Sequence, residues 1–451
     1  MKTLLIVSFH FPPSGKVGGF RPWRFARYLP AHGWRVVVLS AQTDQGDPAP
    51  GWDPQVLAGT RVERTRAFLP GRASWVRSVR GGNDFPPGDA RDGAEGRPPS
   101  ALYRGLRWIK DVTVIPDEHV GWFPFAVRRG LAMIRRENPD LILATDPPHS
   151  ALMVGAALSR LTGRPWVADL RDPWIADPFR RPRPRARENV ERWLEGRLLS
   201  SAARILVTTD SLAGWLARHH ADLDPQGIQT VRHGYDPELF EGLTYRPTDR
   251  FRIVHTGTFY GTRAAVPFLE GLRGFLDRVG PERSAVRVDL VGGFDPENRD
   301  RTLRALCRLH LEDVVSLSGR TGHAESVRRM VESDVLIYVL APRAEGDLIV
   351  PAKTWEYIAS GRPILGLVPE GAEATRILAR FGRGPLVSPP DDVEGVARAL
   401  AGLYQRWREG GLASDPPGPE FEAFSAPRQV AEAARALDAA VGVEAAEGKD
   451  G

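Results

Sequence analysis

The sequence of 451 residues predicts an α/β protein with two doubly wound parallel sheets, one after the other along the chain. Short, continuous apolar runs recur throughout, as expected for strands that are buried on both faces. Segments with helical spacing separate these runs, and loops rich in glycine and proline join them. The series pauses after residue 235 and resumes near residue 251, which divides it into two units.

The first unit is expected over residues 1–235. Its opening apolar run is only about seven residues long, which favours a strand over a signal peptide. The expected strands are residues 3–9, 34–40, 141–145, 166–170 and 205–208, and the expected helices are 20–31, 150–161, 188–200 and 212–219. Residues 81–100 hold glycine, proline and charge in place of apolar side chains, so we interpret them as a flexible insertion.

A second unit is expected over residues 244–410. Its expected strands are residues 252–255, 286–291, 314–318, 335–339, 364–368 and 385–387, and its expected helices include 265–279, 301–310, 324–332 and 393–406. The closing segment, 411–451, predicts a helix at about 420–441 that returns to the first unit, and then a disordered tail.

The whole pattern predicts two tandem Rossmann-like doubly wound domains. Open parallel sheets bind ligands beyond the carboxyl ends of their strands. We therefore expect the two domains to face each other across a cleft, with the functional site between them.

Composition limits the class of protein. Lys and Arg outnumber Asp and Glu by 61 − 56 = 5, an excess too small to indicate nucleic-acid binding. Cys307 is the single cysteine, which excludes an intramolecular disulfide and fits a reducing compartment. No stretch approaches the roughly 20 apolar residues of a membrane span, so we expect a cytoplasmic protein. The basic run at residues 178–193 fits either a solvated loop or peripheral contact with the inner face of a membrane.

The most informative stretch is residues 349–365, IVPAKTWEYIASGRPIL. Pro351 suits a first helical turn, and the Gly-x-Pro near the end stops a helix, so a helix of about ten residues is predicted. The free N–H groups at its start would receive a phosphate, and Lys353 would add a cation there. Glu356, one turn later, offers a carboxylate to the two hydroxyls of a ribose. An exposed Lys–Glu pair on a helix surface is the alternative.

This stretch resembles the donor-site segment K-x-x-E-Y-x-A-x-G-x-P of family 4 glycosyltransferases, enzymes of the GT-B fold. The resemblance implies that Glu356 holds the ribose of a UDP- or GDP-type nucleotide sugar and that the helix start at Pro351 receives the diphosphate. The family usually carries another glutamate eight positions earlier, against the transferred sugar. Leu348 stands at that position here, and Asp347 beside it is the candidate substitute.

Three further loops resemble the family's ligand loops, in the same order along the chain. The residues that they offer for donor binding are Gly18, Gly19, Gly257, Arg263, Gly319 and Arg320. Glycine lets backbone approach a ligand closely, although any tight turn uses it too. Arg263 suits bidentate contact with a diphosphate, as the resemblance implies. Arg21 and Arg24, in the helix after the first loop, would either reach the cleft or lie at the surface.

The first domain should then supply the acceptor side and the polar catalytic groups. Two segments follow its expected strands: residues 145–150 (TDPPHS) and 169–174 (DLRDPW). Asp146, His149 and Asp172 are the candidate catalytic residues in them. Helix caps or ion pairs are the structural alternative for each of these side chains.

The sequence therefore predicts a glycosyltransferase that moves a sugar from a nucleotide-sugar donor to a hydroxyl of a sugar, lipid-linked or small-molecule acceptor. Bacterial polysaccharide, glycolipid and natural-product pathways all fit. The resemblance implies retention of configuration and no metal or cofactor, and no D-x-D motif stands between the domains. Two alternatives remain open: an enzyme like a nucleotide-sugar 2-epimerase, and a non-catalytic subunit that binds sugar nucleotides.

Overall fold

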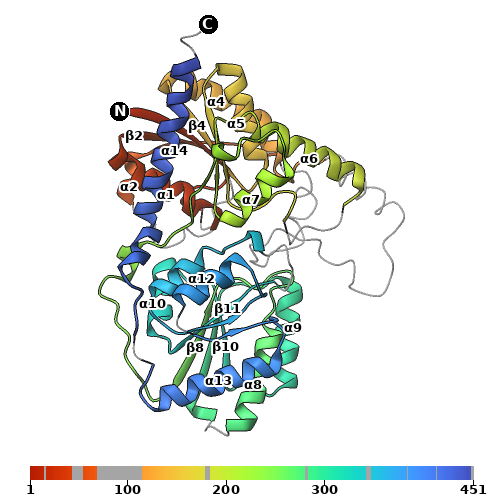
Figure 1. Cartoon of the computed structure of the whole chain (residues 1–451), viewed down its shortest axis with the longest axis vertical. Coiled ribbons are helices and arrows are strands. Elements are labelled where there is room, and N and C mark those ends of the chain that lie inside the picture. Colours follow the sequence, from red (N-terminus) through yellow and green to blue (C-terminus); the bar gives the residue numbers. More distant parts are fainter. Residues whose placement is uncertain are drawn as a thin grey trace.

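The computed structural model describes residues 1–14, 17–42, 54–68, 114–177, 183–279, 283–341, 347–382, 384–412 and 414–447. The predicted insertion at residues 81–100 lies outside these described residues, as does the end of the predicted tail. The described chain forms two parallel sheets, one with seven strands and one with six. Figure 1 shows the two domains one above the other, with α7 (Asp210–His219) and α12 (Glu373–Phe381) at their junction.

The first sheet has the order β3-β2-β1-β4-β5-β6-β7. Its strands are β1 (Lys2–Ser8), β2 (Trp34–Ala41), β3 (Arg61–Thr65), β4 (Leu141–Asp146), β5 (Trp166–Leu170), β6 (Arg204–Val207) and β7 (Ile228–Thr230). The helices between them are α1 (Phe20–Tyr28), α2 (Pro54–Gly59), α4 (Phe123–Glu137), α5 (Ser150–Thr162), α6 (Arg185–Leu199) and α7. Leu5 and Val7 join the core under α4 and α5, whereas Leu4 and Ile6 join the core under α1. Because β1 is buried on both faces, its apolar run is continuous.

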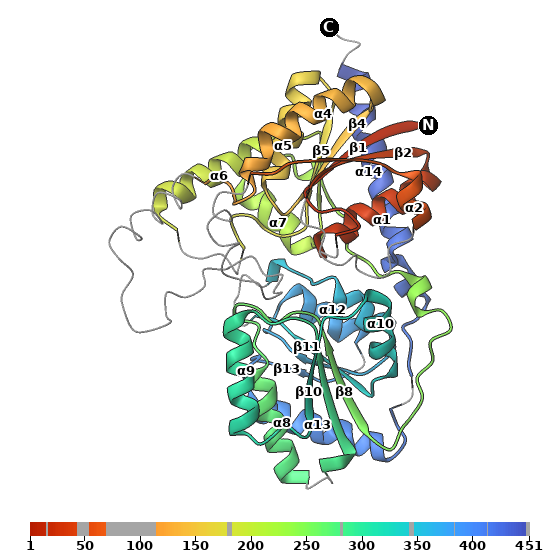
Figure 2. The ribbon, with the colours of Figure 1, turned by 180° about the vertical axis from the view of Figure 1, so that it is seen from behind.

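The second sheet has the order β10-β9-β8-β11-β12-β13. Its strands are β8 (Phe251–Thr256), β9 (Val286–Val291), β10 (Val315–Gly319), β11 (Val335–Val339), β12 (Ile364–Leu367) and β13 (Leu386–Val387). Its helices are α8 (Val266–Val279), α9 (Pro296–Arg308), α10 (His323–Glu332), α11 (Lys353–Ala359), α12 and α13 (Val393–Arg408). Ile253 packs with α8, α9 and α13, which lie together in Figure 2, and Val254 packs with α10, α11 and α12. The predicted fold class is therefore confirmed: both halves are doubly wound parallel sheets.

The chain returns to the first domain after completing the second. The helix α14 (Ala426–Glu447) lies along the upper domain in Figure 1, and Leu437 is fully buried there in the same core as Leu4. A 3-10 helix at Pro419–Phe424 precedes it, so the long helix begins six residues later than 420 and extends past 441. Tyr235 and Ser425 form an isolated parallel bridge, which places the two segments that connect the domains side by side.

Two short strands were missed by the sequence pattern. β3 is a charged edge strand, RVERT, and β7 is a half-buried edge strand of three residues, IQT. Edge strands are short and polar because one side of the strand faces solvent, so they lack a continuous apolar run. Within the described part of the chain, no helix combines the length and the apolar character that a bilayer crossing requires.

Candidate functional site

Lys353, the first residue of α11, lies at the carboxyl ends of β8 and β11. Its Nζ is 3.3 Å from the carbonyl oxygen of Thr256 and 3.4 Å from Nε2 of His255. The rings of Tyr338 and Tyr357 lie 5.4 and 5.5 Å from the same nitrogen. Burial lowers the pKa of Lys353 well below its usual value. A protonated lysine is therefore costly here unless an anion lies beside it.

Glycines let the backbone pack closely next to Lys353. Gly257 has φ +129°, and a Cβ on it would lie 3.4 Å from Nζ of Lys353. Gly292 has φ +136°, and a Cβ on it would lie 1.7 Å from the carbonyl oxygen of Gly257. Gly292 in turn donates its N–H to the carbonyl oxygen of Gly319, at 2.6 Å. The loops that follow β8, β9 and β10 are thus packed backbone to backbone, and side chains would separate them.

Arg263 lies at the boundary between the domains. Its Nη1 is 3.0 Å from the hydroxyl of Tyr260. The positive charge of Arg263 lowers the pKa of Lys353 further. Burial raises the pKa of Asp172 in the first domain, and the charge of Arg263 opposes that rise. Arg263, after β8, and Lys353, at the start of α11, are therefore near enough for their charges to interact, and the charge of Arg263 also acts on Asp172 of the first domain.

The helix α11 is shorter than the sequence predicts. It begins at Lys353 with Ala352 as its N-cap, and Pro351 precedes it as an acceptor for the N–H of Thr354, at 3.0 Å. The expected helix start at Pro351 is therefore wrong, because the proline's fixed φ suits the turn before a helix as well as a first helical turn. With only seven residues, α11 has a small dipole, and the positive charge comes mainly from side chains.

Glu356 is buried one turn after Lys353. His323, at the start of α10, donates a hydrogen bond from Nε2 to Oε1 of Glu356, at 2.7 Å. Nη2 of Arg24 lies 3.9 Å from the same oxygen. Burial lowers the pKa of His323, but the charge and hydrogen bond of Glu356 outweigh it, so the pKa is raised. The alternative of an exposed Lys–Glu pair is wrong, since the carboxylate is held between two domains.

Arg21 and Arg24 do not lie at the surface: their exposed fractions are 4% and 5%. Arg21 pairs with Asp169 of the first sheet, with Nη2 and Oδ1 2.8 Å apart. Arg24 pairs with Asp236 of the connecting segment at 2.7 Å and reaches towards Glu356. Sequence reasoning did not pair Asp236 with Arg24 or His323 with Glu356, because the members of each pair are distant in the chain.

Asp146 and His149 form an ion pair at the end of β4. His149 directs Nδ1 to the carboxylate of Asp146, and its ring stacks on Trp174 with centroids 4.6 Å apart. Burial lowers the pKa of His149, but the charge of Asp146 outweighs it, so the pKa is raised. The start of α5 is capped from elsewhere, because the N–H of Ser150 donates to Oδ2 of Asp117, at 2.8 Å. The cap alternative is therefore wrong for Asp146, and the ion-pair alternative describes what is seen.

Asp172 follows β5 in the first domain. Burial raises its pKa, with the charge of Arg171 opposing. Arg171 donates to the carbonyl oxygens of Gly18, at 2.8 Å, and Pro147, at 2.5 Å, so it joins the loops after β1 and β4. A Cβ on Gly18 would lie 3.0 Å from the ring of His10, and Gly19 is buried at the start of α1. Arg171 thus connects the glycine loop to the loop that carries Asp146 and His149, and its charge acts on Asp172.

The remaining predicted residues lie further out. Gly319 ends β10 with φ +67°, and Arg320 after it is exposed. Asp347 stands in a short turn after β11 and faces α7 of the first domain, beside a cavity of about 400 Å³. The structure therefore brings together Gly257, Arg263 and Lys353, and it leaves Arg320 exposed to solvent.

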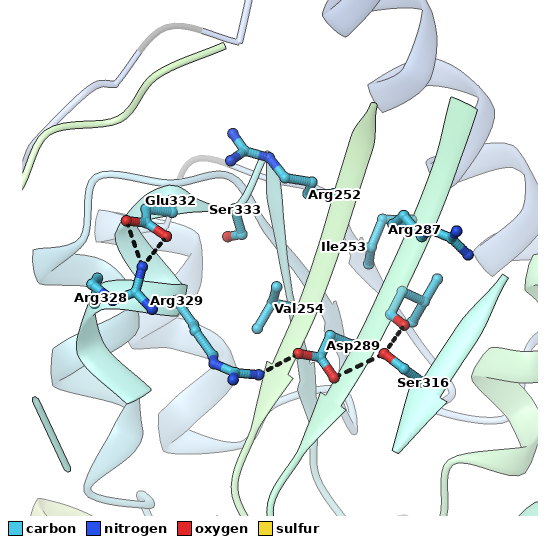
Figure 3. Close-up of a pocket in the computed structure, with 11 residues that line it drawn as sticks. Arg252, Ile253, Val254, Arg287, Asp289, Ser316, Arg328, Arg329, Glu332 and Ser333 are labelled. Carbon is cyan, nitrogen blue, oxygen red and sulfur yellow. Dashed lines mark hydrogen bonds and ion pairs between the residues drawn. The ribbon is translucent and has the colours of Figure 1, made fainter. Parts of the chain in front are cut away.

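A second pocket, of about 260 Å³, lies over the first halves of β8 and β9 and the last turn of α10 (Figure 3). Asp289 on its floor accepts hydrogen bonds from Arg329, at 2.6 Å, and Ser316, at 3.1 Å. No predicted site residue lines this pocket. It lies towards the amino ends of the strands, the wrong side of the sheet for a nucleotide. Among the described residues, no three His, Cys, Asp or Glu side chains are grouped to hold a metal ion.

Comparison with known proteins points to one family. A family profile described as a glycosyl transferase 4-like domain matches residues 19–234. No curated protein sequence matches the chain significantly.

Solved structures share the fold. Sucrose-phosphate synthase from Thermosynechococcus elongatus superposes with a TM-score of 0.59 at 19% identity, covering 100% of this chain and 99% of that one. HepE from Anabaena, solved with UDP and glucose, gives 0.57 at 16% identity and the same coverages, 100% and 99%. A Listeria monocytogenes protein described as a UDP-N-acetylglucosamine 2-epimerase gives 0.51 at 13% identity, covering 94% and 93%.

Proposed function

We propose that the chain, whose residues 19–234 match the glycosyl transferase 4-like domain profile and whose fold is that of solved glycosyltransferases, transfers a sugar from a UDP-sugar to an acceptor hydroxyl. The transfer proceeds with retention at the anomeric carbon, without a metal, in the assembly of a polysaccharide, glycolipid or natural product. UDP is preferred over GDP because HepE, which shares the whole fold, was solved with UDP and glucose. Retention rests on the family resemblance.

One observation carries this proposal. Lys353 lies beside Gly257 and near enough to Arg263 to feel its charge, and Glu356 is one helical turn from Lys353. Two cations match a diphosphate, and a carboxylate one turn further matches the two hydroxyls of the attached ribose. These side chains, which the sequence already singled out, support a binding site for a nucleotide diphosphate.

In the proposed reaction the acceptor hydroxyl attacks the anomeric carbon of the donor. A new bond forms between that carbon and the acceptor oxygen, and the bond from the same carbon to the diphosphate breaks with its electron pair. The acceptor proton passes to the departing diphosphate. Arg263 and Lys353 offset the negative charge that develops there, a role that metal-dependent transferases give to a cation.

The first domain supplies the groups that face the sugar. Asp172 lies opposite Arg263, and the Asp146–His149 pair lies beside the glycine loop. The raised pKa of His149 keeps that ring protonated to higher pH than usual, so it offers a hydrogen-bond donor rather than a base. We assign it to binding a hydroxyl of the transferred sugar.

A second candidate is epimerisation of the donor, favoured by the structural likeness to a protein described as a UDP-N-acetylglucosamine 2-epimerase. Both reactions would use the same nucleotide pocket. They differ in whether a second substrate has a place to bind.

A thermal-shift series tests the choice of nucleotide. We expect UDP to raise the unfolding temperature more than GDP or CDP at equal concentration, since a ligand at 100 times its Kd stabilises the native state by about 2.7 kcal/mol. For a chain of this size, a shift of several degrees is expected. A larger shift with GDP would contradict the base assignment, and no shift with any nucleotide would contradict the donor site.

We also propose that the protein is cytoplasmic and contacts an anionic membrane surface through α6. Val190 and Trp193 on this helix are 46% and 66% exposed. Arg185, Arg192 and Arg197 are exposed on the same helix, which projects sideways from the upper domain in Figure 1. Tryptophan settles at the membrane–water interface, and each arginine near anionic lipid adds about 1 kcal/mol. The predicted basic run at residues 178–193 lies partly outside the described residues, and this helix is its described part.

Vesicle sedimentation tests the contact. The protein should sediment with vesicles of phosphatidylcholine that contain 30% phosphatidylglycerol, less with pure phosphatidylcholine, and less again at high salt. Trp193→Ala should reduce binding, whereas Leu303→Ala, an exposed apolar residue on α9, should not change it. Equal binding by the Trp193 variant and the native protein would refute the assignment to α6.

A further inference from the structure

The cavity of about 400 Å³ beside Asp347 has no role in donor binding as described so far. Its walls come from both domains: α7 of the first domain and the turn that ends in Leu348 of the second. The residues that line it are Ala176, Asp210, Ser211, Gly214, Trp215, Arg218, Asp347 and Leu348. Its volume is within the range of small-molecule sites. Two of its lining residues are close in the chain to the proposed site: Ala176 stands four residues after Asp172, and Leu348 stands five residues before Lys353.

Direct hydrogen bonds between the domains hold the walls in place. Thr209 donates its hydroxyl to the carbonyl oxygen of Leu348, at 2.8 Å. Glu373, from α12, accepts from the N–H groups of Asp210, at 3.2 Å, and Ser211, at 2.7 Å, at the start of α7. A carboxylate at a helix start is a favourable contact. The cavity is therefore fixed wherever the domains meet in this arrangement.

Asp347 gives the cavity an unsatisfied acceptor. Its Oδ1 is shielded from solvent and has no hydrogen bond to the described residues. Burial raises the pKa of Asp347, with the charge of Arg376 opposing. A shielded oxygen without a donor costs about 1–3 kcal/mol, and a ligand hydroxyl would recover that cost. The cavity thus favours a ligand that donates hydrogen bonds.

Trp215 gives the cavity a rigid apolar wall. The indole is half-buried and stacks on His219, with ring centroids 4.3 Å apart and an angle of 12° between the planes. His220 meets it edge-on at 6.0 Å. Two rings hold the indole from within α7 and its C-terminal end, so its orientation is set before a ligand arrives. Such a surface suits the C–H face of a sugar ring.

The charges argue for a neutral ligand. Two carboxylates, Asp210 and Asp347, and one guanidinium, Arg218, line the cavity. Asp210 is paired with Arg232, and the charge of Arg376 acts on Asp347, so the charges around the cavity offset one another. A phosphate would find no excess of positive charge here, whereas Arg263 and Lys353 are basic groups elsewhere in the site. A sugar ring with many hydroxyls and one apolar face fits the unsatisfied oxygen of Asp347, the apolar wall of Trp215 and the charges around the cavity.

We propose that this cavity is the acceptor subsite and that it binds the terminal, uncharged pyranose of a glycoside acceptor. Asp347 accepts from its hydroxyls and Trp215 packs on its face. This inference rests on the proposed function, because an acceptor is needed only by a transferase. Asp347, expected from the sequence to contact the transferred sugar, is reassigned to the acceptor because α7 supplies most of the cavity's lining.

The test uses the full-length protein with UDP and a panel of p-nitrophenyl glycosides: α- and β-glucoside, galactoside, mannoside and N-acetylglucosaminide. Saturation-transfer NMR detects glycoside binding, and calorimetry measures UDP and UDP-glucose. We expect at least one glycoside to bind the native protein. Trp215→Ala and Asp347→Asn should each weaken that glycoside at least tenfold and change the affinities for UDP and UDP-glucose less than twofold. Trp215→Phe should restore part of the binding, which excludes simple misfolding.

Three results would overturn the proposal. One is that the native protein binds no glycoside, or that Trp215→Ala and Asp347→Asn leave glycoside binding unchanged. Another is weakened binding of UDP-glucose with UDP unaffected, since the cavity would then hold the donor sugar. The third is an equal effect of the control Leu303→Ala, at the exposed surface of α9. Failure of the native protein to bind UDP would instead count against the proposed function, so the two failures are distinguishable.

Discussion

Replacing Lys353 with methionine should lower kcat/KM for the nucleotide sugar by about 10²–10³-fold, the usual effect of removing one donor from a site where charge develops. Methionine keeps the length of the side chain and removes its charge. Among the described residues, the Nζ of Lys353 hydrogen-bonds the carbonyl oxygen of Thr256 and the neutral imidazole of His255, so the loss should fall on ligand binding rather than on folding.

The same side chain predicts proton uptake. Burial and the charge of Arg263 lower the pKa of Lys353 in the free protein, and a diphosphate beside it would raise that pKa. Between the two pKa values, binding must therefore bring a proton in from solution. Calorimetry at about pH 9, where a terminal phosphate with a pKa near 6 is already ionised, measures this in buffers of different ionisation enthalpy. We expect uptake by the native protein and none by Lys353→Met.

Lys2→Met is the matched control, because Lys2 pairs with Asp438 at the surface, on the first domain. It should leave both affinity and proton uptake unchanged. Native protein that binds UDP at this pH with no proton uptake would show that Lys353 does not meet the diphosphate.

Replacing Glu356 with alanine should weaken UDP binding by about ten- to a hundredfold. Hydrogen bonds to a charged group contribute about 1.5–3 kcal/mol, and each 1.4 kcal/mol is a factor of ten in affinity. Glu356→Gln keeps one acceptor oxygen and should lie between alanine and the native protein. Glu332→Ala, at the far end of α10, is the control and should have no effect.

A ligand variant locates the effect of Glu356 on the ribose. 2′,3′-dideoxy-UDP lacks the hydroxyls that Glu356 is proposed to hold. This compound should bind the native protein about as weakly as UDP binds Glu356→Ala. The Glu356→Ala substitution should then lower the affinity for the dideoxy compound little further. Equal losses for UDP and the dideoxy compound would show that Glu356 acts through His323 and Arg24 instead of touching the ribose.

The sequence predicts the doubly wound architecture well because burial on both faces is a local signal. Every residue from Leu4 to Val7 is fully buried, so the apolar run in β1 is complete and easily recognised. The same logic fails at the edges, where β3 carries Arg61, Glu63 and Arg64. An edge strand pairs with a neighbouring strand on one side only. It therefore needs no continuous apolar run, and composition does not identify it as a strand.

The candidate site is predicted less completely because its partners are distant in sequence. Lys353 and Glu356 are found from one helical segment, but the residues that hold Glu356, His323 and Arg24, lie 33 and 332 positions away. Asp236, which anchors Arg24, lies in the segment that connects the domains. Such pairs depend on how the two domains meet, and neither periodicity nor spacing contains that information.

Product analysis tests the central claim most directly. The full-length protein is incubated with UDP-glucose and the glycoside that it binds best, and the mixture is analysed by chromatography and mass spectrometry. We predict equal amounts of UDP and of a glycoside that is one hexose heavier, with none formed by Glu356→Ala at the same donor concentration. Accumulation of an isomer of UDP-glucose, without UDP and without the heavier glycoside, would contradict the transferase assignment.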